Sequence, residues 1–255
     1  MIRIAAVAFN TVRELVRNKL FYNLALFALA LIASSAFLAR LTIGQWTRLI
    51  TDISLSAMHA VAVLIAVLVG VGLIAGEVDR RTAYIVLAKP IARWEFLLGK
   101  YLGLVATLAL NLAVMFAAMV LVLEATHYRV SDGSAAAAML IFAETWVLAA
   151  FAVLFSSFTT ATLAAIFTFS FFVIGHLASE LVFFGQKSTL SIGRFAAQLL
   201  HYTLPNLERF NLKPQAIHGV AVSVEVVLVQ LGYGLAYAAA LLLVAAVVFG
   251  RRDLK

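Results

Sequence analysis

Residues 76–103 read GEVDRRTAYIVLAKPIARWEFLLGKYLG, a charged stretch that separates two long apolar runs. Only 12% of the chain is charged, yet this stretch gathers five basic and three acidic side chains. They are Arg80, Arg81, Lys89, Arg93 and Lys100, with Glu77, Asp79 and Glu95. A charged block between apolar runs is typical of a loop that connects two membrane-spanning helices. The fold therefore depends on whether the apolar runs cross a membrane.

The apolar runs are long and numerous enough to predict a membrane protein. Of the 255 residues, 64% are hydrophobic, and the mean hydropathy is +1.05. Soluble domains are only about 45–50% apolar. Runs of about 20 apolar residues indicate transmembrane helices, and we expect them near residues 20–38, 57–75, 97–123, 137–155, 161–184 and 219–249. The predicted fold is an all-α integral membrane protein in which residues 20–255 form one domain of six transmembrane helices.

Residues 1–19 are expected to form an amphipathic helix that lies in the cytoplasmic membrane interface. One side carries Arg3, Asn10, Arg13, Glu14 and Arg17, and the other carries Ile2, Ala5, Phe9, Val12 and Val16. A basic face of this kind suits phospholipid headgroups. The same charges interrupt the apolar core that a cleavable signal peptide would need.

The distribution of basic residues predicts that both termini are cytoplasmic. Twelve of the 19 lysines and arginines fall at the two termini and in the stretch 76–103. Cytoplasmic loops carry this excess. Four of the other seven lie in the long connection at residues 185–218, where apolar residues repeat at helical spacing. This connection is predicted to contain an amphipathic segment packed on the outer membrane face.

The stretch between the second and third spans has the properties of a docking element. Residues 80–88 are predicted to form a short helix, because Pro90 disfavours helical geometry in Lys89. This helix presents Tyr84, Ile85 and Leu87 from a basic frame, which suits a groove on another protein. The alternative is that the basic residues only set topology and bind anionic lipid.

A second helix is predicted to begin near Pro90 and to continue into the third span. Arg93 and Lys100 are expected to extend their charged ends to lipid headgroups while their stems cover apolar surface. Both side chains would then lie at the cytoplasmic edge of the bilayer.

This stretch resembles the cytoplasmic loop of ATP-binding-cassette transporter permeases of the type-2 (exporter) family. There, an acidic residue, a basic pair and a short helix lead into a run similar to AKPIARWEFLLGKYLG at residues 88–103. Three later stretches agree in order: FSSFTTATLAA at 155–165, LPNLERFN at 204–211 and FGRRDLK at 249–255. The resemblance thus extends over most of the chain.

The resemblance implies a permease subunit, in a bacterial or archaeal cytoplasmic membrane, that exports or extracts a substrate. It implies a dimer with a second copy or a related permease, with or without an accessory periplasmic protein. Two copies of a separate ATPase subunit would dock on a coupling helix in the loop 76–96. The implied partner-binding residues are Glu77, Arg80, Arg81, Tyr84, Leu87, Lys89 and Pro90.

The chain lacks the motifs of an ATPase and of a nucleic-acid-binding protein. No G-x-x-x-x-G-K-[ST] phosphate loop occurs, and Gly99-Lys100 lacks both the upstream glycine and the following hydroxyl. We therefore expect no cofactor and no catalytic residue in this chain, with ATP and magnesium in the partner ATPase. The basic residues lie in short blocks beside apolar spans, which argues against a nucleic-acid partner.

Glu144, His176 and Glu225 are candidates for a polar site inside the membrane. An acidic residue at the centre of a transmembrane helix costs roughly 2.5–3.5 kcal/mol, so each should have a partner or a wet cavity. The alternative places Glu144 and Glu225 near the ends of their spans, in the interface. His176 and Glu180 share a helix face, but two ligands make a poor metal site, and no third ligand is evident. No metal site is predicted.

Two other classes of protein remain as alternatives. An ion-coupled transporter or channel that works alone would show broken helices or paired charges at the midplane, and here charges are few and no proline interrupts a span. An intramembrane enzyme is disfavoured because the chain has no H-E-x-x-H motif and no cysteine.

Overall fold

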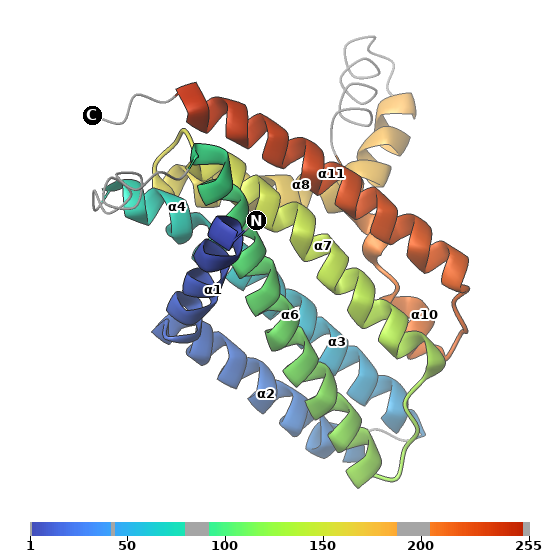
Figure 1. Ribbon diagram of the computed structural model, residues 1–255. Helices are drawn as coiled ribbons and strands as arrows, with labels where there is room; N and C mark the ends of the chain where they lie inside the picture. The colour runs from blue at the N-terminus through green and yellow to red at the C-terminus, as the bar shows by residue number, and fades with distance from the viewer. Residues whose placement is uncertain (1, 42–43, 80–91, 188–204, 252–255) are drawn as a thin grey trace.

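The structure, a computed structural model, describes residues 2–41, 44–79, 92–187 and 205–251, and every regular element in these ranges is a helix (Figure 1). Six helices are long and apolar enough to cross a membrane. They are α2 (Lys19–Arg40), the continuous α3–η1–α4 (Trp46–Leu64, Ile65–Val69 and Gly70–Asp79), α6 (Arg93–Ala125), α7 (Asp132–Ser156), α8 (Ala161–Lys187) and α11 (Val224–Arg251). The predicted all-α fold with six spans is confirmed.

Several spans begin at residues other than those that hydropathy indicates, the second and the sixth among them. The second begins at Trp46, eleven residues before the expected position, through a polar segment whose Thr51 and Ser54 are buried against the bundle. The sixth begins at Val224, five residues later than expected, and Gly219 adopts a left-handed backbone conformation (φ +68°) in the turn after the preceding short helix. Neither start follows from hydropathy alone.

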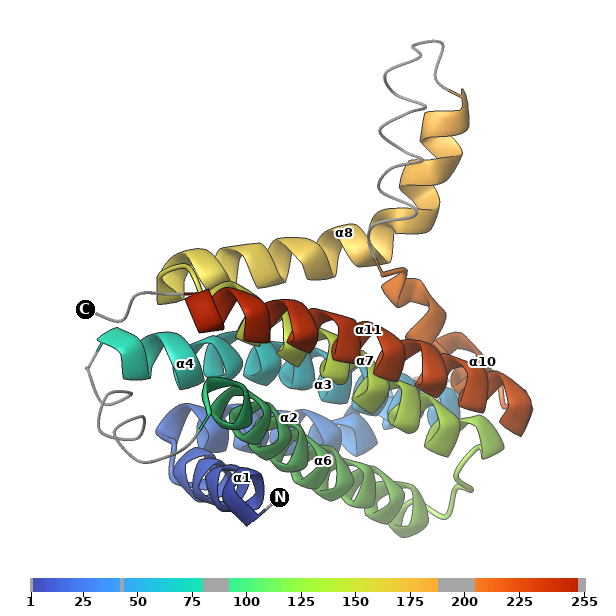
Figure 2. The same ribbon diagram turned by 45° about the horizontal axis from the view of Figure 1, so that its top comes forward.

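The spans α3 and α7 form the centre of the bundle, and the other four surround them (Figures 1 and 2). In the most apolar 18-residue window of each helix, 72% of residues are buried in the second span and in α7, against 17% in α11. Many of the buried residues of α7 are small, which lets neighbouring helices approach closely. The outer helices expose large apolar side chains, as a helix facing lipid does.

The second span contains a π-helical turn, η1, at its centre. Gly70 follows this turn at the point where the span meets α6 and α7. A β-carbon on Gly70 would lie 2.9 Å from Leu104 Cδ2 and 3.2 Å from Ala152 Cβ. The glycine thus permits close three-helix contact beside an irregular turn of the kind that often marks functional sites.

The amphipathic helix predicted at the N-terminus is present as α1 (Ile2–Val16), and it packs on α6. Gly99 and Gly103 form the contact surface on α6: a β-carbon on either would lie 2.5–2.6 Å from a side chain of α1, Val7 or Thr11. Phe9, on the face predicted to meet the membrane, is exposed. The helix therefore has a third, protein-facing side that its amphipathic pattern did not reveal.

The expectation that Lys100 reaches lipid headgroups is wrong. Its side chain is 2% exposed, and its Nζ lies 3.0 Å from Glu14 Oε2 of α1. Because α1 covers this part of α6, the ammonium group is enclosed by protein and pairs with a carboxylate.

The connection before the last span contains η2 (Leu207–Phe210) and α10 (Lys213–Ile217). It alternates buried and exposed residues, and its buried side packs against α3, α7 and α8. Leu207 fills the space left by Gly175, and the ring of Phe210 lies against Gly234 of α11. These contacts fasten the connection to two spans.

Candidate functional site: a buried polar cluster between three spans

Three spans contribute one polar side chain each to a cluster inside the bundle. His59 belongs to α3, Glu144 to α7 and His176 to α8. His59 Nε2 lies 2.9 Å from Glu144 Oε2, and His176 Nε2 lies 3.6 Å from Glu144 Oε1. One ligand-type atom from each residue lies within 4.8 Å of the other two. We refer to His59, Glu144 and His176 as the polar cluster.

Two neighbours orient the imidazole rings of the polar cluster. The backbone carbonyl of Phe172 lies 3.2 Å from Nδ1 of His176 and can only accept, so Nδ1 carries a proton and Nε2 is the nitrogen directed to Glu144. Lys213, on α10, places its Nζ 3.2 Å from Nδ1 of His59. The two rings also lie near each other, with centroids 5.6 Å apart.

The Glu144 carboxylate is the most buried group of the polar cluster, at 2% exposure. Its Oε1 and the Nε2 of His59 are buried without a hydrogen bond, although His59 Nε2 and Glu144 Oε2 are in close contact. A buried carboxylate is costly unless hydrogen bonds or a nearby cation compensate it. Lys213 supplies one nearby positive charge, and the free atoms leave room for a further interaction.

Glu144 lies at the middle of its membrane-spanning helix. Glu144 is twelve residues from either end of α7, about 18 Å along the axis at 1.5 Å per residue. The hydrocarbon core is about 30 Å thick. The interpretation of Glu144 as an interfacial residue near a span end is therefore wrong.

The structure brings together two of the three residues predicted for an intramembrane polar site. Glu144 and His176 meet, whereas Glu225 is exposed in the first turn of α11, where a carboxylate is favourable beside the helix N-terminus. Glu180 is exposed on α8, one turn beyond His176. The residues predicted as a helical pair thus belong to different environments.

His59 and Lys213 are the members of this site that sequence reasoning missed. His59 lies inside the expected span 57–75, and a polar side chain among apolar ones is a signal that could have identified it. Lys213 lies in the connection at residues 185–218, and no local sequence pattern indicates that α10 packs against α3 and α7.

The other candidate site, the loop between the second and third spans, is described only at its edges. Glu77 lies in α4, close to its end at Asp79. The remaining predicted partner-binding residues, Arg80, Arg81, Tyr84, Leu87, Lys89 and Pro90, lie outside the described residues.

The start of α6, which follows this loop, is firmly held. The Glu95 carboxylate accepts the backbone N–H of Ala92 over 3.0 Å, which stabilises the first turn. Arg93 Nη1 donates to the carbonyls of Phe249 and Gly250, at 3.1 and 3.2 Å, so the start of α6 is joined to the end of α11. The ends of both helices therefore meet beside the loop.

The model of the ABC-2 family transporter proteins matches residues 6–254, which is nearly the whole chain. This chain belongs to that family. An ABC-2 permease is a multi-pass membrane component of a transporter, and such permeases pair with an ATP-binding subunit. No curated protein matches the chain.

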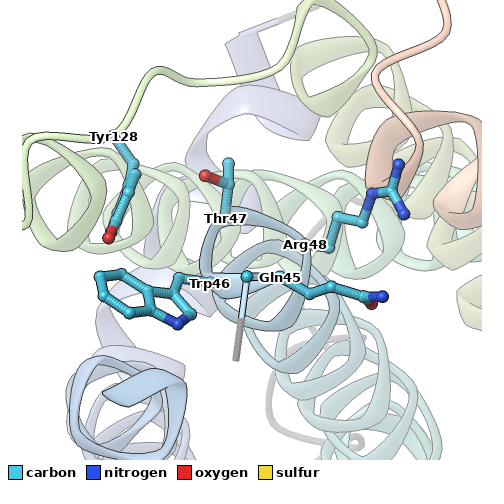
Figure 3. Close-up of a pocket in the computed structure, with 6 residues that line it drawn as sticks. Gln45, Trp46, Thr47, Arg48 and Tyr128 are labelled. Atoms are coloured by element: carbon cyan, nitrogen blue, oxygen red, sulfur yellow. The ribbon is translucent and has the colours of Figure 1, made fainter. Parts of the chain in front are cut away.

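The permease also has an open hollow of about 540 Å³ at the start of α3, lined by residues 44–48 and Tyr128. Figure 3 shows Trp46 beside Tyr128, with Arg48 directed away from them. The two rings make an edge-to-face contact with centroids 5.8 Å apart. Aromatic residues are typical of the membrane interface, which fits the place of this pair at the start of a membrane-spanning helix.

Proposed function

We propose that this ABC-2 permease is one of two membrane subunits of a transporter that exports a substrate or extracts it from the bilayer. The second membrane subunit is another copy or a related permease. Two separate ATPase subunits, which bind ATP and magnesium, dock on the loop 76–96 and supply the energy. The assembly lies in a bacterial or archaeal cytoplasmic membrane, with both termini of the permease in the cytoplasm. The family match over residues 6–254 carries this proposal.

The helices around the loop support a route for force from the ATPase into the membrane. The span that ends in α4 precedes the loop and α6 follows it. Arg93 ties the start of α6 to the end of α11, and α1 packs on α6 at Gly99 and Gly103. A displacement of the loop would therefore move α6 together with α1 and α11.

The experiment is purification of the permease from its native membrane, followed by identification of bound subunits and an ATPase assay. We expect an ATPase subunit in a one-to-one ratio. The double variant Tyr84→Ala/Leu87→Ala should lose this subunit or its coupled ATPase activity, because it removes the apolar anchors predicted on the loop. The matched control is Phe37→Ala/Leu41→Ala, which truncates an exposed aromatic and an exposed leucine at the far end of α2.

Two results would count against the proposal in different ways. If the permease purifies without an ATPase and its activity does not depend on nucleotide, the assignment to an ATP-driven transporter fails. If the ATPase is bound but the Tyr84/Leu87 variant keeps normal coupling, only the docking site is wrong. The α2 control should behave as the unmodified protein in both measurements.

The second candidate function is an ion-coupled transporter that works alone. The observation in its favour is the polar cluster, whose Glu144 lies at the middle of its span, since midplane polar sites bind coupling ions in such proteins. Flux through the purified chain in vesicles without nucleotide would support it, and strict dependence on a partner ATPase would exclude it.

A further inference from the structure

The polar cluster has the composition of a transition-metal site. Two imidazoles and one carboxylate are the protein ligands of many zinc sites with three protein ligands, and imidazole also suits copper, iron and nickel. We propose that His59, Glu144 and His176 bind one divalent transition-metal ion of the zinc class. Neither the family match nor the proposed coupling to an ATPase requires such an ion.

The spacing of the three side chains fits a tetrahedral ion. Zinc binds imidazole nitrogen and carboxylate oxygen at about 2.0–2.2 Å, which places neighbouring ligand atoms about 3.3–3.6 Å apart in a tetrahedral site. Here Nε2 of His59 lies 2.9 Å from one carboxylate oxygen of Glu144, and Nε2 of His176 lies 3.6 Å from the other. The three ligand atoms all lie within 4.8 Å of one another. Side-chain shifts that draw the three atoms together would complete the geometry.

Two atoms of the polar cluster have no hydrogen bond and could serve as metal ligands once His59 carries its proton on Nδ1. Glu144 Oε1 and His59 Nε2 are buried and form no hydrogen bond, even though His59 Nε2 is close to the other carboxylate oxygen. A buried polar atom without a hydrogen bond loses the solvation that it has in water. An ion between these atoms would satisfy both of them.

His176 is already oriented as a metal ligand. Its Nδ1–H is held by the Phe172 carbonyl, so Nε2, which lies 3.6 Å from Glu144 Oε1, is the nitrogen that a metal ion would bind. Ligating histidines usually donate their second ring N–H to a carbonyl or carboxylate, which fixes the ring and the tautomer. The local helix backbone provides this support without any metal.

Lys213 competes with a metal ion for the imidazole of His59. Its Nζ lies 3.2 Å from His59 Nδ1, where an ammonium donates to the ring and leaves the proton on Nε2. A metal at Nε2 needs that proton on Nδ1, so Lys213 must withdraw when the ion binds. Lys213 is partly exposed on the short helix α10, and its four-carbon stem allows this movement.

The ion would connect three helices inside the bundle. His59, Glu144 and His176 come from α3, α7 and α8, and Lys213 comes from the connection that packs beside them. Three protein ligands leave a fourth tetrahedral position for water or another small donor. Binding should therefore stabilise the packed arrangement of these spans by linkage.

The test is metal binding by the full-length permease, without a histidine tag, in lipid nanodiscs after chelator treatment. Zn²⁺ is titrated in competition with a chromophoric chelator, and bound metal is counted by elemental analysis. We expect one ion per chain and a higher temperature of unfolding with Zn²⁺. Co²⁺ should give the visible absorption bands of a tetrahedral nitrogen–oxygen site, which reads the geometry directly in the unmodified protein.

Substitutions test whether the metal ion binds at the polar cluster. Glu144→Gln and His176→Gln should each weaken Zn²⁺ binding by at least about 100-fold, since loss of a supporting group alone costs about 10–100-fold. Lys213→Met should bind Zn²⁺ more tightly, because it removes the competing charge. The controls His127→Asn and Glu225→Gln remove an imidazole and a carboxylate that are exposed and outside the cluster, and should leave affinity unchanged. Asparagine also suits the left-handed backbone of His127 (φ 62°).

Three results would overturn the proposal. An affinity that is equal in the cluster variants and the controls, or a Co²⁺ spectrum without tetrahedral bands, overturns the proposal. A loss of affinity in Lys213→Met as large as in the ligand variants also overturns it. If Glu144→Gln does not fold, His176→Gln and the Co²⁺ spectrum of the unmodified chain decide the question. None of these measurements needs a partner ATPase, so failure of the proposed function would leave their result intact.

Discussion

Lys100 and Glu144 are both 2% exposed, and each depends on contacts with another helix. Lys100 pairs with Glu14, which is half exposed, near the end of the bundle where α1 covers α6. Glu144 lies deep among α3, α7 and α8, beside two histidines. A buried charge is tolerated only with a partner in good geometry. The first pair therefore fits a structural role and the second site a binding role.

Arg93 offers a residue-level test of how α6 and α11 are joined. Its Nη1 donates to the carbonyls of Phe249 and Gly250, which lie in a last helical turn where carbonyls have no intrahelical donor. We expect Arg93→Gln to cost about 1–2 kcal/mol in the free energy of unfolding. Backbone amides in the last turn of α11 should then exchange hydrogen faster, as measured by mass spectrometry.

The matched control for this prediction is Arg48→Gln, which removes an exposed arginine at the other end of the bundle. Its exchange pattern at the end of α11 should equal that of the unmodified permease. Unchanged exchange in Arg93→Gln would show that the two carbonyl contacts do not hold the helix end.

At the scale of elements, the contact of α1 with α6 depends on two glycines of α6, Gly99 and Gly103. A β-carbon on Gly103 would lie 2.5 Å from Thr11 Cβ and 2.8 Å from the carbonyl oxygen of Ala8. Backbone atoms cannot move aside as a flexible side chain can, so the whole helix α1 would have to shift. The amphipathic helix is thereby tied to α6, the span that follows the loop 76–96.

Gly103→Ala should detach or displace α1. We expect a loss of about 1–3 kcal/mol in the free energy of unfolding, the usual cost of overpacking. Gly232→Ala makes the same change in α11 at a position with no atom within 4 Å of the new β-carbon. There alanine should be neutral or favourable by up to about 1 kcal/mol, because it is the better helix former.

Thermal unfolding of both variants in the same detergent measures whether the two substitutions change stability in opposite directions. A midpoint that falls for Gly103→Ala and stays level or rises for Gly232→Ala agrees with the close packing of α1. Equal midpoints would mean that α1 rests loosely on α6.

At the scale of the whole molecule, two central spans are enclosed by four outer ones. The outer helix α11 exposes Val224, Leu228, Leu235, Leu243 and Val247. In a bilayer such apolar side chains need no protein partner, because lipid tails are equally apolar. The exposed surface of α11 is thus compatible with lipid and with the second membrane subunit of the proposed dimer.

The proposed orientation of the permease can be tested because the chain contains no cysteine. Arg129→Cys and Arg251→Cys make the same exposed substitution at opposite ends of the bundle. From the excess of basic residues at the termini and in the loop 76–103, we expect Arg129→Cys to be outside and Arg251→Cys to be cytoplasmic. An impermeant maleimide on intact spheroplasts should label only Arg129→Cys, and permeabilisation should expose Arg251→Cys. The reverse labelling would invert the topology.

The amino-acid sequence by itself determined the class of the protein and its layout. Hydropathy is a sum over neighbouring residues, so six spans, their order and the amphipathic character of residues 2–16 can be read locally. The early start at Trp46 escaped this reading, because its first turns are polar and are stabilised by burial. The family resemblance, which also depends on local runs of residues, agrees with the match over residues 6–254.

Only the tertiary structure decided which polar residues meet. His59 and Glu144 are 85 positions apart, and Lys213 is 154 positions from His59. Helical periodicity relates residues three or four positions apart, so it pairs His176 with Glu180 and carries no information on contacts between spans. The glycines that admit α1 and η2, and the burial of Lys100, likewise follow from packing between helices. Such contacts are set by how the helices fit together, which no local pattern in the chain specifies.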